Sequence, residues 1–213
     1  MKGIERIILS NDLITTVFII GFILLFLMKV FNAKFLKGYS TAFFTKGFIE
    51  DVAEQRPKLF GSFFSLIRLF CILIISLTIY LIYTLKHSGS SSTLFLSILT
   101  FVLIYYLVKN SFIIFATNIF DVKQELNYLI FTKNGYLYNV CLWLFPVLVL
   151  YQYCYPNYIF LTTSISFLLI FRLFLVLFNN KSIVFRHLFY FILYFCTLEI
   201  APLLLIYKTI ELI

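Results

Sequence analysis

Six long runs of apolar residues, separated by more polar connections, dominate the hydrophobic pattern of this chain. An α-helix needs about 20 apolar residues to cross the roughly 30 Å hydrocarbon core of a bilayer. The runs have about this length and cover Leu13–Phe31, Phe60–Leu85, Thr93–Val108, Tyr136–Tyr155, Tyr158–Phe178 and Phe185–Tyr207. Because helices satisfy their backbone hydrogen bonds internally, the pattern predicts an all-α, polytopic transmembrane helix bundle that forms one domain over residues 1–213.

Two of the runs raise questions about their extent. The third is the shortest, and "NSFIIFATNIF" follows Lys109, so residues 109–120 either extend the third helix or lie at the membrane interface. The first run is longer than the apolar core of a signal peptide. Its leader contains Glu5 and Asp12, and no small-residue cleavage site follows. We therefore expect the first run to be retained as a span.

The composition supports a membrane protein. The chain is 62% hydrophobic and 12% charged, with a mean hydropathy of +1.03. Soluble domains are closer to half apolar and a quarter charged. The excess of apolar residues lies in the six runs and leaves no room for a separate soluble domain.

The distribution of basic residues predicts the orientation of the bundle. Four Lys and Arg lie in the termini and the even-numbered connections: Lys2, Arg6, Lys86 and Lys208. Twelve lie in or next to the odd-numbered connections: Lys29, Lys34, Lys37, Lys46, Arg56, Lys58, Lys109, Lys123, Lys133, Arg172, Lys181 and Arg186. The positive-inside rule then puts the odd-numbered connections in the cytoplasm and both termini outside. The net charge of +8 is mostly a topology signal and favours contact with anionic lipid headgroups over nucleic acid.

The first cytoplasmic connection mixes aromatic and basic residues. Such a segment is suited to lie in the inner headgroup layer. It is also the longest piece available to a cytoplasmic partner. The candidate lipid or partner contacts are Lys34, Lys37, Phe43, Phe44 and Lys46. An anchoring connection and a specific docking site both remain open.

Three ionisable residues fall inside the predicted spans, where function is the default hypothesis. At 1.5 Å per residue, Arg68 lies roughly 12 Å and Arg172 roughly 10 Å from the cytoplasmic ends of their spans. Both side chains are long enough to snorkel to the headgroups. Glu199 is roughly 20 Å from the inner face, and a carboxylate there must be paired, hydrogen-bonded or protonated.

Pro202 strengthens the case that Glu199 belongs to a special site. A proline has no N–H, so the carbonyl four residues earlier loses its helical partner and is available to a polar group. Arg68 and Arg172 are the preferred charged partners of Glu199, although the difference in depth strains a direct pair. The site is either proton- or ion-responsive, a polar clamp for a partner helix, or a buried hydrogen-bonded group that fixes helix register.

Recognisable catalytic and cofactor motifs are missing from the sequence. It contains no H-E-x-x-H, G-x-S-x-G or phosphate-binding loop, so we expect no catalytic residues, no cofactor and no metal site. The cysteines occur singly and are expected to pack as small apolar residues: Cys71, Cys141, Cys154 and Cys196.

The last run carries the one distinctive motif. Its "CTLEI-P" core, Cys196–Ile200 followed by Pro202, resembles an uncharacterised multi-pass membrane family of Bacteroidota that is described only as a domain of unknown function. The resemblance implies an inner-membrane location in a Gram-negative envelope. It implies no catalytic residues.

Two functions follow as hypotheses. The first is a non-enzymatic inner-membrane protein that serves as an accessory or structural subunit of an envelope complex, with other membrane proteins as partners. The alternative is a small transporter or a proton- or ion-coupled component that uses Glu199. A membrane enzyme is the weakest reading, because no nucleophile and base can be assembled.

Overall fold

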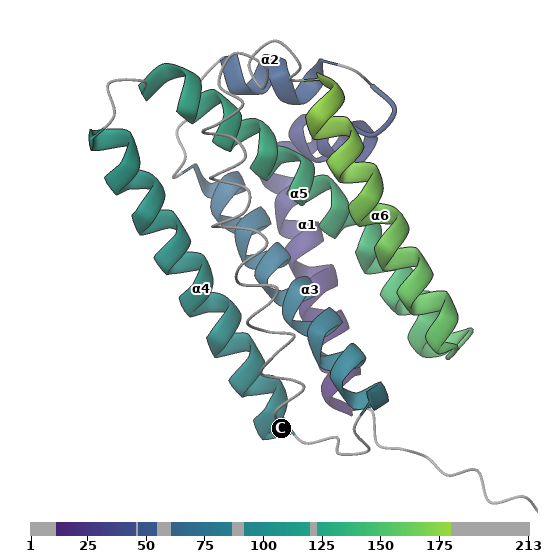
Figure 1. Ribbon diagram of the computed structural model, residues 1–213. Coiled ribbons are helices and arrows are strands. Elements are labelled where there is room, and N and C mark those ends of the chain that lie inside the picture. Colours follow the sequence, from purple (N-terminus) through teal and green to yellow (C-terminus); the bar gives the residue numbers. More distant parts are fainter. Residues whose placement is uncertain (1–11, 46, 55–60, 87–91, 120–122, 180–213) are drawn as a thin grey trace, which may run out of the picture.

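The computed structural model describes residues 12–45, 47–54, 61–86, 92–119 and 123–179. Their secondary structure is helical throughout (Figure 1): α1 (Asp12–Thr41), α2 (Phe48–Glu54), α3 (Ser62–Lys86), α4 (Ser92–Ile119), α5 (Lys123–Tyr153) and α6 (Tyr158–Asn179). Five of these helices, all except α2, are long and apolar enough to cross a membrane. The described part of the chain therefore confirms an all-helical fold with several candidate spans. The predicted sixth span, with Glu199 and Pro202, lies outside the described residues.

The first span ends at a kink in α1. Asn32 has φ −159° and ψ 89°, which are not helical values, so α1 consists of two helical segments. The Asn32 Oδ1 accepts a hydrogen bond from the Phe35 N–H at 3.2 Å. Because an asparagine that binds the N–H three residues later is a typical N-cap, Asn32 begins the second segment of α1. The sequence predicted the end of this span at Phe31, next to the kink.

The helices of the third and fourth spans are longer than the hydropathy pattern predicted. α4 continues past Val108 to Ile119, so helix, and not a separate interfacial segment, follows the third span. α5 begins at Lys123, well before Tyr136. Hydropathy detects only the apolar part of a helix, whereas backbone hydrogen bonding continues through polar residues until a breaker occurs.

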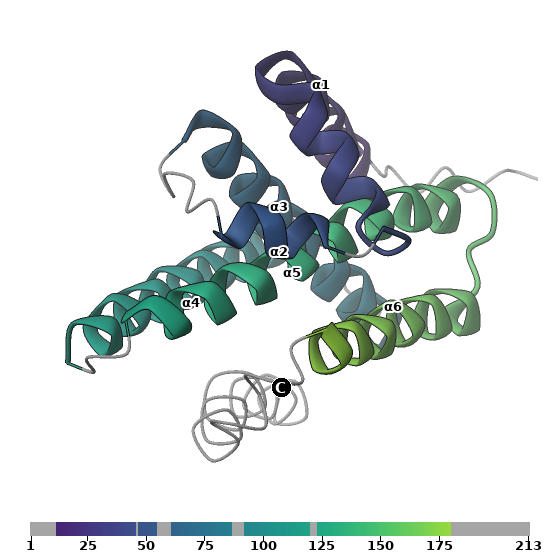
Figure 2. The ribbon, with the colours of Figure 1, turned by 90° about the horizontal axis from the view of Figure 1, so that it is seen from above.

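Helices α3 and α5 form the centre of the bundle. α3 contacts α1, α4 and α5, and α5 contacts every other described helix. Figure 2 shows α5 running between α1 and α6. α4 and α6 expose many large apolar side chains, including Leu96, Phe101, Ile104, Ile159, Phe167 and Ile170. Exposed apolar side chains in this number are compatible with lipid rather than water.

Close packing joins α1 to α5 at Gly21. A Cβ at this position would lie 2.7 Å from the Phe145 ring, so glycine permits the approach. Phe145 is buried and makes edge-to-face contacts with Phe18 and Phe22 of α1. Small residues that allow close backbone approach and aromatic pairs both stabilise helix packing in membranes.

The chain after the kink folds back onto one end of the bundle. Gly47 has a φ of 96°, which favours glycine, and lies immediately before α2. We refer to residues 33–45 and 47–54 as the cap, and to this end of the bundle as the cap end (Figure 1). Tyr39, Ile49 and Val52 of the cap are buried. These three side chains therefore pack against protein, while the position of the first connection in the headgroup layer stays a prediction.

Candidate functional site

Two hydrogen bonds from α5 attach the cap to the bundle. The Asn139 Nδ2 donates to the Tyr39 carbonyl at 2.6 Å, and the Trp143 Nε1 donates to the Ser40 carbonyl at 3.0 Å. Both carbonyls belong to the last turn of α1, where no later helical N–H is available. Asn139 and Trp143 are one turn apart, so one face of α5 satisfies the end of α1.

A second set of contacts holds α2. The Tyr136 hydroxyl donates to the Glu50 carboxylate at 2.9 Å. Ile49 packs against Gly135, where a Cβ would lie 2.7 Å from its Cγ2 methyl group. Phe48 packs edge-to-face on Tyr39 with ring centroids 5.5 Å apart. The cap is therefore a folded part of the protein.

The cap leaves several of the candidate contact residues on its surface. Lys34 and Lys37 are exposed, and Phe44 is 76% exposed. Phe43 is instead half-buried and packs on Phe171 of α6 with ring centroids 5.0 Å apart. Lys46 lies outside the described residues.

A second site is polar and lies within the bundle. Arg68 of α3 is adjacent to Tyr138 of α5, and Tyr138 is adjacent to Tyr106 of α4. Cys71, one turn after Arg68, is adjacent to Cys141 of α5 and near Arg172 of α6. We call these six residues, from four helices, the arginine cluster: Arg68, Cys71, Tyr106, Tyr138, Cys141 and Arg172.

The arginine cluster is largely shielded from solvent. Arg172 is 8% exposed, and Cys71 and Cys141 are buried. Arg68 is half-buried, and its Nε has no hydrogen-bond partner among the described residues. The two arginines therefore pack inside the bundle, rather than extending along a lipid-facing surface as snorkelling side chains do.

The members of the arginine cluster lie at similar depth. At 1.5 Å per residue, Arg68 is about 9 Å from Ser62, and Arg172 is about 10 Å from Asn179. On the same scale Tyr138 is about 10 Å from Phe131, where the apolar part of α5 begins. Cys71 and Cys141 lie deeper, about 14 Å from Ser62 and about 15 Å from Phe131, so the cluster occupies the half of the bundle nearest the cap end.

Sequence reasoning identified only part of this site. The sequence indicates Arg68 and Arg172 as candidate partners of Glu199 and not as neighbours of each other, and it predicts only packing roles for Cys71 and Cys141. A usable signal was present, because Arg68-x-x-Cys71 and Tyr138-x-x-Cys141 each put two non-aliphatic groups on one helix face. Glu199 and Pro202 lie outside the described residues, so their position relative to this cluster is not described.

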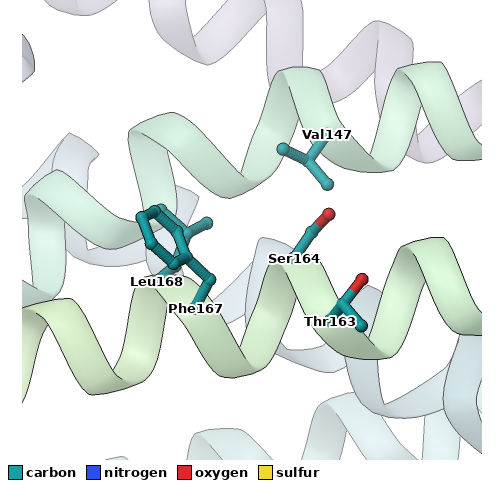
Figure 3. Close-up of a pocket in the computed structure, with 5 residues that line it drawn as sticks. All are labelled: Val147, Thr163, Ser164, Phe167 and Leu168. Atoms are coloured by element: carbon teal, nitrogen blue, oxygen red, sulfur yellow. The ribbon is translucent and has the colours of Figure 1, made fainter.

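The best-defined pocket is at a different place. It has a volume of about 330 Å³, lies between α5 and α6, and is open and mostly apolar (Figure 3). Val147 comes from α5, and the α6 residues around it are Thr163, Ser164, Phe167 and Leu168. The Thr163 hydroxyl already donates to the Ile159 carbonyl at 2.7 Å. The lining supplies no charged group, and the described residues contain no group of three or more metal-ligating side chains.

Comparisons with known proteins identify the family of this chain. No curated protein and no solved structure shows significant similarity to it. A family model matches residues 14–210, which include all six predicted spans except the first residue of the first. The match agrees with the expected resemblance to an uncharacterised family, while its restriction to Bacteroidota stays a prediction. The chain thus belongs to the family described as Domain of unknown function (DUF4271).

Proposed function

We propose that this protein is a non-enzymatic integral inner-membrane protein that serves as an accessory or structural subunit of an envelope complex. The observation that supports a subunit is the surface of the cap. Phe44 is 76% exposed on a segment whose other side is held by Asn139 and Trp143. An exposed aromatic side chain on a fixed backbone loses little conformational entropy on binding, as partner-binding anchors require.

The proposed orientation puts the cap in the cytoplasm and both termini in the periplasm. Its support is the positive-inside rule, because Lys34 and Lys37 of the cap lie at the same end as Lys109 and Lys133. The cap lysines would then contact anionic headgroups beside the partner. The non-enzymatic part of the proposal rests on the sequence, in which no catalytic motif occurs.

A small transporter or a proton- or ion-coupled component is the second candidate. The arginine cluster favours it, since charged side chains buried in spans often belong to ion or proton pathways. In this reading Glu199 titrates, and Arg68 or Arg172 responds to its charge.

Co-purification separates the two functions. Tagged wild-type protein is extracted in mild detergent, and stoichiometric partners are identified by mass spectrometry. Phe44→Ala removes the exposed ring of the cap, and Glu199→Gln removes the intramembrane charge. Phe26→Ala is the matched control, because Phe26 is 65% exposed on the membrane-spanning part of α1.

The subunit function predicts a stoichiometric partner that is lost from Phe44→Ala and retained by Phe26→Ala. Loss of that partner from Glu199→Gln would add an intramembrane contact to the interface. Purification of a lone chain in every sample would contradict the subunit function. Ion or proton flux in liposomes, abolished by Glu199→Gln, would then establish the second candidate.

A further inference from the structure

The two buried thiols of the arginine cluster are in contact across the central pair of helices. Cys71 of α3 is 3% exposed and Cys141 of α5 is 1% exposed, and a hydrogen bond joins their side chains. At 1.5 Å per residue they lie about 14 Å from Ser62 and about 15 Å from Phe131, where the apolar segments of α3 and α5 begin at the cap end. The hydrogen bond and the matched depth agree that the two sulfur atoms are neighbours, although seventy positions separate the residues in the sequence.

The ligands for a metal site do not accompany this pair in the part of the chain that the structure describes. Cys154, the third described cysteine, is exposed at the opposite end of the bundle, after α5. The described residues contain no group of three or more His, Cys, Asp or Glu side chains that could hold a metal ion. Structural zinc sites use four such ligands. Two neighbouring thiols have the groups needed for a disulfide.

The surroundings of the two thiols suit a disulfide. Phe70 and Ile74 on α3 and Leu144 on α5, close to the cysteines on their helices, are buried. A disulfide is uncharged and has no S–H group, so an apolar interior accommodates it without a hydrogen-bond partner. Its sulfur atoms must approach to about 2.04 Å, and two thiols that already share a hydrogen bond start close to this arrangement. Hydrogen peroxide is small and uncharged, so it can reach a buried pair without the cost of burying a charge.

We propose that Cys71 and Cys141 are a redox-sensitive pair, which hydrogen peroxide oxidises to a disulfide between α3 and α5. In the first step one sulfur attacks a peroxide oxygen, the O–O bond breaks, and a sulfenic acid and one water form. The second sulfur then attacks the sulfenic sulfur, the S–S bond forms, and a second water leaves. The two thiols lose two protons and two electrons, and the peroxide is reduced to two waters. Two equivalents of a cellular thiol reverse the reaction by thiol–disulfide exchange, and are themselves oxidised to a disulfide.

The disulfide forms in the turn of α5 that holds the cap. Cys141 lies between Asn139 and Trp143, whose side chains donate to the Tyr39 and Ser40 carbonyls. Once the link is closed, α3 and α5 cannot separate, and the turn that attaches the cap is fixed to the centre of the bundle. A disulfide also constrains the unfolded chain, so the oxidised protein should unfold at a higher temperature. Oxidation of the pair does not require a partner subunit, so this proposal and the proposed function can fail separately.

Counting free thiols in the full chain tests the pair. A two-thiol variant with Cys154→Ser and Cys196→Ser keeps Cys71 and Cys141, and is reconstituted in phospholipid vesicles in the reduced state. After exposure to hydrogen peroxide the protein is denatured with N-ethylmaleimide, and mass spectrometry counts the labelled thiols and identifies linked peptides. A shifted-thiol control adds Cys141→Ser and Leu142→Cys to the two-thiol variant. It moves one thiol to the next, half-buried position of α5, about 100° around the helix.

The two-thiol variant is expected to lose both free thiols, to gain a link between the peptides that contain Cys71 and Cys141, and to regain both thiols in dithiothreitol. Its unfolding temperature should be at least about 5 °C higher when oxidised. The shifted-thiol control should form a link at least tenfold more slowly, because its thiols do not face each other.

Three outcomes would overturn the proposal. The first is that both thiols stay free at a peroxide concentration that oxidises the exposed Cys154 of the wild type. The second is irreversible oxidation of Cys71 or Cys141 to a sulfinic acid without a link. The third is a link that forms equally fast in the shifted-thiol control, since the observed contact would then not direct the reaction. The first two outcomes need only the two-thiol variant and the wild type, so the test stays valid if the control does not fold.

Discussion

Replacing Asn139 with leucine should loosen the cap and leave the rest of the bundle folded. Asn139 is fully buried, and its Nδ2 satisfies the Tyr39 carbonyl at 2.6 Å. Leucine is similar in size but has no donor, so the carbonyl is left buried without a partner. The Tyr39 side chain and the α2 residues Ile49 and Val52 are buried in the same cap.

The magnitude follows from two opposing terms. A buried carbonyl without a partner costs about 1–3 kcal/mol. The Asn139 Oδ1 is itself buried without a partner among the described residues, so removing it recovers up to about 1 kcal/mol. The net cost is therefore about 1–2 kcal/mol, which corresponds to a roughly 5- to 30-fold more frequent opening of the cap, at tenfold for each 1.4 kcal/mol.

Hydrogen exchange followed by mass spectrometry in detergent micelles measures this opening directly. Peptides from residues 33–54 should exchange faster in Asn139→Leu, and peptides from α3 should be unchanged. Trp143→Phe is the control. It removes the hydrogen bond from Trp143 to the Ser40 carbonyl, but the Trp143 side chain is 40% exposed. Water can replace that bond, so exchange should rise by no more than about threefold.

Cap exchange in Asn139→Leu that equals the wild-type rate would refute the assigned role of this hydrogen bond. A larger effect of Trp143→Phe than of Asn139→Leu would show that burial does not set the cost of losing a donor here. Faster exchange throughout α3 would mean that the cap is not a separable unit.

Three further predictions concern packing, capping and the intramembrane acid. Gly21→Val should lower stability by about 1–3 kcal/mol, because its Cβ meets the Phe145 ring, whereas Ala33→Val at an exposed position should be nearly neutral in thermal unfolding. Asn32→Ala should cost about 1 kcal/mol through loss of the N-cap, with faster hydrogen exchange confined to the second segment of α1; a change confined to the first segment would contradict it. Glu199→Ala should destabilise more than Glu199→Gln, because the amide can still hydrogen-bond, and equal, negligible effects on thermal stability would remove this residue from any mechanism.

The existence of the long helices could be predicted from the sequence because lipid imposes a simple length rule. The predicted Phe60–Leu85 and Tyr158–Phe178 differ from α3 and α6 by at most two residues at either end. The start of α5 at Lys123 was missed because Lys123 and Glu125 lower hydropathy without breaking a helix. Hydropathy thus predicts the span and not the whole helix.

The attachment of the cap and the pairing of helices in the arginine cluster could not be predicted, because both are products of tertiary contact. The bond from Asn139 to the Tyr39 carbonyl joins residues one hundred positions apart, and no local pattern indicates it. The same is true of Arg68 and Tyr138, which meet only when α3 and α5 pack. Local sequence indicated that the buried arginines were unusual, but not which residues surround them.

Labelling single cysteines from one side of the membrane tests the central claim most directly, namely that the chain is a membrane bundle with its cap in the cytoplasm. Thr45 is exposed in the cap, and Cys154 is exposed at the opposite end, after α5. Variants that keep only Cys154, or only a cysteine from Thr45→Cys, are treated with a membrane-impermeant maleimide in spheroplasts. We expect Cys154 to react at once and the cysteine at position 45 to react only after permeabilisation. Reaction of the cap position in intact spheroplasts, or equal reaction of both positions, would contradict the account.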